Sequence, residues 1–336
     1  MNSPANLARC EGSATSKPLH ALLFDAQGND HPVSLKEISL EQLSDEQVLW
    51  VNVDRSACTN LYELTEWLGI PAQELPTKTE STGRPRVENF GSWLKVQVQA
   101  IGSDGTIEPL SFLVGINWIV TIHDAPIEVL DNLNHQIRND TQLGRLSGAG
   151  FLAAMLDWHL TSFFRSIERL DAEVDVLDDQ AIAPDPNTPI LPRLRVLRKK
   201  IAALRRLVIP HREVFSTLQR PDIASVFELT AQDPIFDTLA NQMERVVDSI
   251  DNSRDLVLGS FEMYTAQMSQ RTNDIMRVLT VVTVLLLPVG TLAGILGMNF
   301  QAGFFDSKTT GFIVAVGFML CFVTIGWWLA RRKGWL

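Results

Sequence analysis

The sequence predicts an α+β membrane protein: an N-terminal α/β domain, a helical hairpin, and a very long stalk helix that continues into the first of two C-terminal spans. Three observations carry this prediction. The early part of the chain alternates between strand-like and short helical segments, a helical pattern of more than 60 residues follows without a turn cluster, and two long uncharged segments lie near the C-terminus. The 336 residues are enough for more than one domain.

Residues 1–18 are polar and lack the apolar core of a signal peptide, so we expect a flexible tail. Residues 19–142 are expected to form a cytoplasmic α/β domain with two short helices, near Leu40–Glu46 and Leu61–Leu68. The predicted strands are His20–Asp25, Val48–Asp54, Arg86–Ile101 and Leu110–His123. The cysteines share no metal-like spacing and cannot all pair, which favours a reducing compartment; they are Cys10, Cys58 and Cys321.

Residues 143–228 are expected to form a helical hairpin, with helices near Gly150–Ile182 and Leu191–Leu218 on either side of the proline-rich turn 183–189. The first arm is acidic and the second is basic. We expect the two arms to pair with each other or to be solvated. Two alternatives remain open: the basic arm could sense charge or anionic lipid, and the acidic arm could bind a regulatory metal.

The stalk, residues 229–277, is predicted to continue without a break into a first span at 278–296. Its apolar stripe is expected at Val247, Ile250, Val257, Phe261, Tyr264, Met268 and Ile275. A second stripe, shifted by one or two positions, is entirely polar, acidic or small: Asp248, Asn252, Asp255, Gly259, Glu262, Ala266, Ser269 and Asn273. Such a 3.5-residue repeat implies parallel helices that wind around a shared axis.

The first span is 19 residues without a charge, and residues 311–330 form a second, each long enough to cross a bilayer. Between them lies an outer loop, 297–310, and after them a basic tail, 331–336. Positive charge flanks the cytoplasmic ends, so we expect both termini in the cytoplasm. Trp327, Trp328 and Trp335 would anchor the inner interface. Because two helices cannot enclose a hydrophilic path, a transporter of this form must be an oligomer.

The polar stripe keeps its register into the first span as threonine, glycine and a few apolar residues. Several parallel copies would turn this stripe toward a central path lined by oxygen atoms and small residues. Two simpler readings stay open: the cytoplasmic stripe as the solvated face of an amphipathic helix, and Gly290 with Gly294 as a small-residue packing contact.

The segment Gly297-Met298-Asn299 stands at the outer end of the first span, with one span and a basic tail remaining. In this layout the chain resembles the CorA family of divalent metal ion transporters. Residues 81–87, STGRPRV, and the ending RRKGWL are similar to the zinc-transporting (ZntB) branch of that family, here with Gly83 inserted.

The resemblance implies a funnel-shaped homopentamer in the cytoplasmic (inner) membrane, with the first span lining the pore and Asn299 holding a hydrated metal ion at the outer entry. The implied selectivity motif is Gly297, Met298 and Asn299. The implied pore-lining residues are Asn273, Met276, Thr280, Thr283, Leu287, Gly290 and Gly294. The expected cytoplasmic funnel residues are Asp248, Asn252, Asp255 and Glu262.

Zinc uptake is the expected activity, and magnesium, cobalt or nickel transport by the same pore is the alternative. Two departures separate the chain from magnesium-transporting relatives: the loop 301–310 has only one acid and one base, and position 290 is glycine. Neither histidine nor cysteine lies on the expected path, so oxygen atoms would face a hydrated ion.

The net charge of −10 argues against nucleic acid as a partner. No glycine-rich loop or catalytic triad points to an enzyme, and no cofactor is expected beyond the transported zinc or magnesium. The expected partners are the lipid bilayer, divalent ions and further copies of the chain. A non-conducting membrane-tethered sensor or scaffold is the remaining alternative.

Overall fold

The computed structural model describes residues 19–26, 30–35, 38–44, 46–56, 61–76, 83–102, 105–127, 130, 147–182, 189–229, 234–297 and 308–334. The chain forms two compact units. The first comprises Met1–Leu177 and Leu191–Val257, and the second comprises Asp178–Ile190 and Leu258–Leu336.

The core of the first unit is a seven-stranded sheet with the order β2-β1-β3-β7-β6-β5-β4. The strands are β1 (Leu19–Asp25), β2 (His31–Pro32), β3 (Gln47–Asp54), β4 (Arg86–Asn89), β5 (Leu94–Ile101), β6 (Ile107–Val114) and β7 (Trp118–His123). The β3–β7 pair is parallel and the other pairs are antiparallel. The predicted strands His20–Asp25 and Val48–Asp54 are confirmed.

Three predictions for this domain were wrong in detail. The segments Arg86–Ile101 and Leu110–His123 are each divided by a tight turn, so that they contribute to four strands rather than two. Gly91, in the first of these turns, has a φ of 87°, which only glycine adopts without strain. The helix expected at Leu40–Glu46 is a single 3₁₀ turn, Leu40–Gln42. Turns this short do not interrupt the strand-like alternation, so the pattern alone cannot find them.

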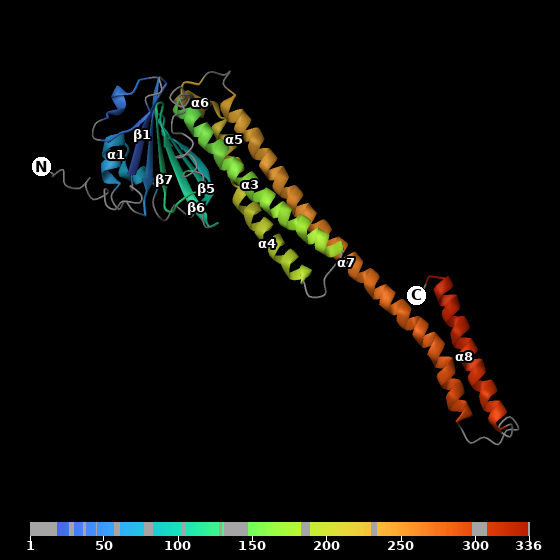
Figure 1. Cartoon of the computed structure of the whole chain (residues 1–336). Helices are drawn as coiled ribbons and strands as arrows, with labels where there is room; N and C mark the ends of the chain where they lie inside the picture. Colours follow the sequence, from blue (N-terminus) through green and yellow to red (C-terminus); the bar gives the residue numbers. More distant parts are fainter. Residues whose placement is uncertain are drawn as a thin grey trace. The chain divides into compact units, whose positions relative to one another are not determined.

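The two faces of the sheet are covered by different helices (Figure 1). Helix α1 (Tyr62–Leu68) contributes Leu64 and Leu68 to a core that includes Val51 and Val120. On the opposite face, Phe151 of helix α3 (Gly148–Ile182) packs against Phe24 and Trp50, with ring centroids 5.5 and 6.1 Å apart. Since successive strand residues alternate between faces, both faces of the central strands are apolar.

Helix α3 begins where it touches the β6–β7 turn. The Gly148 N–H donates to the Ile116 carbonyl at 2.6 Å, and a Cβ on Gly148 would lie 2.0 Å from the Gly115 carbonyl oxygen. Because both neighbours are backbone atoms, no side chain can move aside, and only glycine permits this approach.

We therefore expect Gly148→Ala to lower the free energy of unfolding by about 2–3 kcal/mol through overpacking. Denaturant unfolding of the purified protein measures this change. Gly259→Ala is the control, because a Cβ there meets nothing within 4 Å and alanine favours a helix. Equal stability of the two variants would show that the start of α3 can shift away from the turn.

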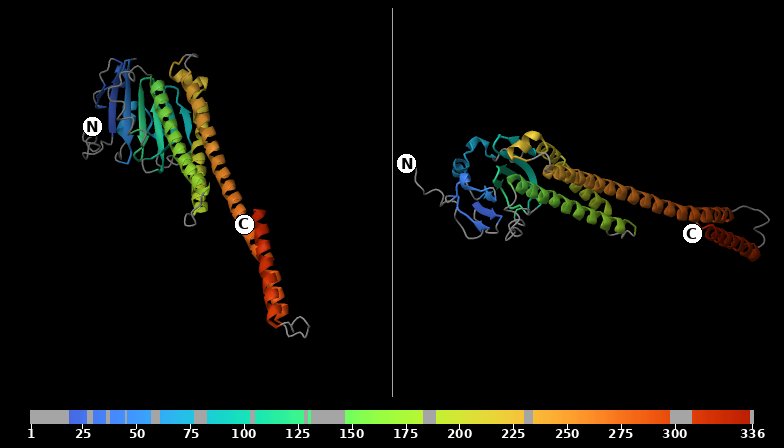
Figure 2. Two further views of the ribbon diagram at one scale, coloured as in Figure 1. Left: turned by 45° about the vertical axis from the view of Figure 1, so that its right-hand side comes forward. Right: turned by 90° about the horizontal axis from the view of Figure 1, so that it is seen from above.

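The helical part of the first unit follows the sheet. Helix α3 is antiparallel to α4 (Ile190–Val208), and the first part of α7 (Ile235–Leu296) runs beside both in two views (Figures 1 and 2). The single helix expected over Leu191–Leu218 was wrong: α4 ends at Val208 and α5 (His211–Leu218) follows, because Pro210 has no N–H to continue the ladder. A short helix, α6 (Pro221–Val226), was not predicted.

Two histidines meet inside this helical layer, His159 from α3 and His211 from α5. Both are completely buried, and their ring centroids are 5.3 Å apart. His211 donates from Nδ1 to the Leu207 carbonyl at 2.9 Å and accepts at Nε2 from the Gln99 N–H at 3.0 Å. Neither ring nitrogen of His159 has a hydrogen-bond partner among the described residues.

Burial is the main cause of the pKa shifts at this pair. It lowers the pKa of His211 to about 4, against the opposing effect of the hydrogen bonds. The pKa of His159 is well below its ordinary value because of burial and, second, because of the neighbouring His211. Both imidazoles are therefore neutral at pH 7.

Candidate functional site

Helix α7 runs for 62 residues without a break, as predicted, and it contains Pro288. Proline removes one backbone hydrogen bond, but a long helix in an apolar setting tolerates the loss. One helix thus carries both the expected cytoplasmic funnel residues and the expected pore-lining residues.

The part of α7 before residue 258 buries one face against its own chain. The buried positions alternate by three and four residues: Phe236, Leu239, Met243, Val246, Ile250, Ser253 and Val257. Of the predicted apolar stripe, Val247, Ile250 and Val257 are buried within the chain. Phe261, Met268 and Ile275, farther along the helix, are 45%, 43% and 68% exposed, so the described part of the chain leaves this part of the stripe uncovered.

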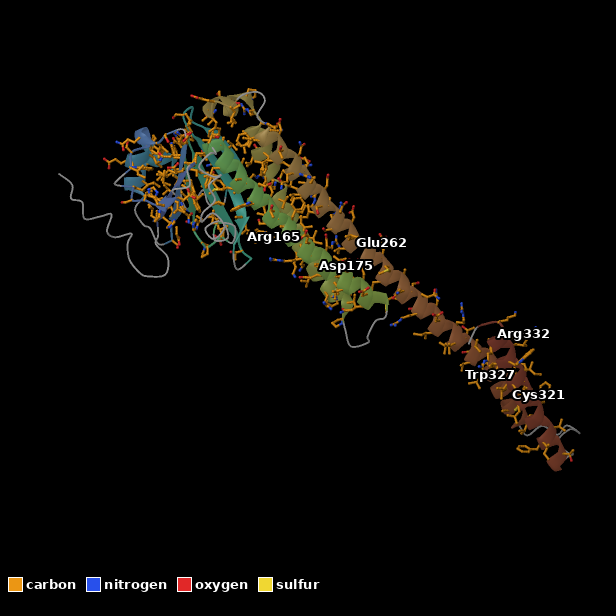
Figure 3. The ribbon with its side chains drawn as sticks, turned by 45° about the horizontal axis from the view of Figure 1, so that its top comes forward. Arg165, Asp175, Glu262, Cys321, Trp327 and Arg332 are labelled. Carbon is orange, nitrogen blue, oxygen red and sulfur yellow. The ribbon has the colours of Figure 1, made fainter. Side chains whose placement is uncertain are left out.

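The polar stripe lies on the opposite face of the helix. Asp248 and Asn252 are each two positions, or about 200°, from Ile250 at the centre of the buried face. All eight predicted members are exposed: Asp248, Asn252, Asp255, Gly259, Glu262, Ala266, Ser269 and Asn273. Figure 3 labels Glu262 on this helix.

Two acidic residues of α7 outside the polar stripe form ion pairs within the chain, which distinguishes them from the acids of the stripe. Asp251 accepts from Arg205 Nε at 2.7 Å, and Glu244 pairs with Arg212. Asp248 and Glu262, by contrast, form no ion pair with the described part of the chain. Asp255 has one long contact, 3.5 Å, to the adjacent Arg254. The negative charge of the stripe is therefore largely available to a cation.

The apolar part of α7 and helix α8 (Lys308–Arg332) cannot be core helices of a soluble domain. The most apolar windows of Ile235–Leu296 and Thr310–Arg332 have mean hydropathies of 2.3 and 2.2, and only 6% and 0% of these windows are buried. A soluble protein would not expose so much continuous apolar surface. The 25 residues of α8 span about 37 Å, enough to cross a bilayer core of about 30 Å.

Helix α8 packs on one side of α7. A Cβ on Gly326 would lie 2.2 Å from Leu285 Cδ2, so the two helices touch at this glycine. One turn away on each helix, Val281 and Ala330 are buried, at 5% and 8% exposed. The sequence offered a signal for this contact that we did not use, since Gly326 and Ala330 are small residues four positions apart.

The expected pore-lining residues occupy the side of α7 that α8 leaves uncovered. Gly290 is five positions, or about 140°, from Leu285. The whole set is exposed: Asn273, Met276, Thr280, Thr283, Leu287, Gly290 and Gly294. The polar stripe and this set follow one 3.5-residue register along the sequence, and each is turned away from the intrachain contacts of its own part of the helix.

The glycines on this face make no close helix contact with the described part of the chain. A Cβ on Gly290 or on Gly294 would meet nothing within 4 Å, so the close approach of α8 uses Gly326 instead. The hydroxyls of Thr280 and Thr283 donate to the carbonyls four residues back, at 2.7 and 2.8 Å. Their oxygens keep lone pairs that can accept hydrogen bonds from water around an ion.

The outer end of the helix is described only up to Gly297, which follows the last helical residue, Leu296. Met298 and Asn299 lie outside the described residues, as does most of the loop 297–310. Within the part of the chain that the structure describes, no group of three or more His, Cys, Asp or Glu side chains could hold a metal ion.

Aromatic and cationic side chains meet at the C-terminal end of α8. Arg331 lies over the ring of Trp327 and Arg332 over that of Trp328, with the guanidinium carbons 5.4 and 5.3 Å from the ring centroids. Figure 3 labels Trp327 and Arg332. Such pairs suit a membrane–water interface, where the ring and the charge reach different environments.

Known proteins share this architecture. Among solved structures, the complete CorA magnesium transporter of Methanocaldococcus jannaschii superposes with a TM-score of 0.73 at 22% identity, covering 94% of this chain and 98% of that one. The full-length CmaX protein superposes with a TM-score of 0.70 at 20% identity, covering 96% and 99%. At these identities the likeness shows the fold.

Sequence relatives carry different metals in their names. The chain is 26% identical to the cobalt/magnesium transport protein CorA of Thermotoga maritima, over 75% of this chain and 73% of that protein. It is 23% identical to the divalent cation transporter CmaX of Pseudomonas aeruginosa, over 95% and 96%. It is also 22% identical to the zinc transport protein ZntB of Pectobacterium atrosepticum, over 96% and 97%.

The family model described as CorA-like Mg2+ transporter protein matches residues 45–332, which is most of the chain and includes all of α7 and α8. A family of transporters agrees with the absence of catalytic motifs from the sequence. The chain belongs to the CorA-like family, and its activity is transport of divalent cations across a membrane.

Proposed function

We propose that several copies of the chain form a ring in the cytoplasmic membrane and conduct a hydrated divalent cation along the face of α7 from Asn299 to Asp248. One observation supports this above all. A single face keeps its register from the acidic stripe into the apolar part of the helix, and it is exposed opposite the intrachain contacts throughout. In a single copy, the hydroxyls and glycines of this face would be exposed to lipid, whereas in a ring they would face water and the ion.

The composition of this face suits an ion that keeps its water. It carries carboxylates, amides, hydroxyls and glycines together with Ala266, Met276 and Leu287, and no histidine, cysteine, lysine or arginine is among the stripe residues. Divalent ions such as magnesium lose their first water shell reluctantly, so amide and hydroxyl oxygens would bind them through that shell. Asn299 amides in a ring would select the hydrated ion at the entry, with Gly297 and Met298 shaping the opening.

The ring is proposed as a homopentamer on the resemblance to the CorA family, with α8 outside the ring formed by α7. Both termini are placed in the cytoplasm. The cations Arg331 and Arg332, stacked on Trp327 and Trp328, support this orientation because positive charge and tryptophan gather at the inner interface.

Zinc is the proposed cargo, supported by the likeness of residues 81–87 and of the basic ending to the zinc-transporting branch. Magnesium, cobalt or nickel is the second candidate, supported by the 26% identity to a cobalt/magnesium transport protein. The two candidates share one pathway, so the residues of α7 would serve either ion.

Metal uptake into proteoliposomes tests the proposal, with zinc and magnesium compared for the wild type and Asn299→Ala. We expect zinc uptake in the wild type and its loss by at least about tenfold in the variant, because the entry amide is gone. Magnesium uptake with the same sensitivity would keep the pathway and change the cargo.

Uptake of neither zinc nor magnesium by the wild type, from a folded oligomer, would instead favour a sensor or scaffold. Leu320→Ala is the control, because Leu320 is 63% exposed on the apolar surface of α8 and lies off the proposed path.

A further inference from the structure

The hairpin of α3 and α4 is held together inside the chain by one flank of each helix. Lys200 Nζ lies 2.9 Å from a carboxylate oxygen of Glu173, and buried apolar residues such as Val174 and Ile201 pack between the helices. This ion pair also sets the register to within about one helical turn: residue 173 lies near the level of residue 200, so residue 175 lies near the level of residue 198 in the antiparallel pair.

The other flank of α3 is exposed and mainly acidic, with one cation, Arg165, at its border beside Glu168. Asp175 is two positions, or about 200°, from Glu173, so it points away from α4. Glu168, seven positions earlier, lies on the same flank and is also exposed. Neither carboxylate forms an ion pair with the described residues. Figure 3 labels Asp175 on this helix.

The corresponding flank of α4 is basic and exposed. Arg198 is two positions before Lys200 and therefore points away from α3. Three more exposed cations lie with it: Arg195, Lys199 and Arg206. None of the four has an ion pair among the described residues, whereas the cations that face the chain's own helices do, as Lys200 does with Glu173 and Arg205 with Asp251.

Each hairpin thus carries unpaired acids on one outer side and unpaired bases on the other. Opposite charges on opposite sides are what a head-to-tail contact between identical copies requires, because the acidic side of one copy meets the basic side of the next. Rotation about an axis parallel to the hairpin keeps every residue at its height. Residues at similar heights along this axis then meet, so Asp175 of one copy lies opposite Arg198 of the next, and Glu168 lies opposite Arg206.

We propose that, in the assembled protein, the acidic flank of α3 (Glu168 and Asp175) docks on the basic flank of α4 (Arg195, Arg198, Lys199 and Arg206) of the neighbouring copy. The contact rests on the proposed oligomer and adds to it a cytoplasmic belt of ion pairs outside the α7 face. Because these pairs are solvent-exposed, they contribute little to the stability of the ring. They determine mainly which flank of one copy meets the next copy, and at which register.

Disulfide trapping in the full-length protein tests the contact. Cys10, Cys58 and Cys321 are first replaced by serine, and Asp175→Cys and Arg198→Cys are placed on two copies that carry different tags and are expressed together. Under mild oxidation we expect a disulfide-linked dimer that contains both tags. With both substitutions in one chain, a ladder up to the full ring should form.

Glu173→Cys with Lys200→Cys is the matched control. These positions face each other within one hairpin, so their disulfide should form inside the chain and give no dimer. The control shows that the hairpin is folded and that the oxidant reaches it.

Light scattering of the detergent-solubilised protein separates failure of this contact from failure of the ring. A protein without an oligomer would overturn the proposed function together with this contact. An intact oligomer with the control disulfide but no mixed dimer would overturn the contact alone. So would trapping of Arg198→Cys with Glu262→Cys on another copy, because the basic flank would then face α7.

Anionic lipid is the other partner that the basic flank could take. Trapping is therefore repeated in nanodiscs of neutral and of anionic lipid. Equal yields support the contact between copies, and a yield that falls at least about threefold in anionic lipid would overturn it in favour of headgroup binding.

Discussion

Gly290→Phe should reduce metal uptake into proteoliposomes by at least about tenfold while the oligomer remains intact. Gly290 is exposed on the side of α7 away from the contact with α8, and an added Cβ would meet no atom of the described residues within 4 Å. The phenyl ring therefore costs little in a single copy. In a ring, one bulky group from every copy would meet near the axis and close the path of a hydrated ion.

Leu320→Phe provides the matched control, since it adds the same ring to the exposed surface of α8, where Leu320 is 63% exposed. We expect its uptake to stay within about twofold of the wild type. Unchanged uptake in Gly290→Phe would mean that this face of α7 does not line the path. Loss of the oligomer in Gly290→Phe would instead assign Gly290 to a close contact between copies.

The long helix and the two spans were predictable because their signals are local. From Ile235 to Leu296 nothing but Pro288 breaks a helical pattern, and two uncharged segments read directly as spans. The polar face was predictable for the same reason, since spacing along one helix fixes which residues share a side.

Features that depend on another part of the chain were not predictable. The side of α7 that α8 covers is decided by Leu285 and Gly326, which are far apart in sequence. Asp251 is paired with Arg205, whereas most acids of the polar stripe are not paired within the described residues. The sequence alone does not distinguish these two groups of acidic residues. The turn at Gly91 lies within a segment whose alternation is typical of a single strand. The contact between His159 and His211 joins two helices, and no spacing along the sequence predicts it.

The pair of His159 and His211 makes the stability of the first unit depend on pH. In the folded state burial holds the pKa of His211 at about 4, while in the unfolded chain it returns to the ordinary value of about 6.5. Below pH 6.5 the unfolded chain binds a proton that the folded chain does not, so stability falls as the pH falls. The loss from His211 alone approaches about 3 kcal/mol near pH 4, and His159 adds to it.

We expect His159→Leu to raise the free energy of unfolding by about 1–3 kcal/mol at pH 7, and by more at pH 5. The two side chains have similar volumes, and leucine removes two buried nitrogens that have no hydrogen-bond partner in the described residues. Denaturant unfolding of the full chain at pH 7 and pH 5, followed by tryptophan fluorescence, measures both differences.

His211→Leu is the matched opposite case, because the neighbouring imidazole is fully bonded. Its loss would strand the Gln99 N–H and the Leu207 carbonyl, each held now at 3.0 and 2.9 Å, so we expect destabilisation by about 1–3 kcal/mol at pH 7. The two variants therefore compare a buried imidazole without hydrogen bonds with a hydrogen-bonded one at neighbouring positions in the core. If His159→Leu destabilised the protein as much as His211→Leu, the nitrogens of His159 would have a partner, such as an enclosed water, that contributes to the fold.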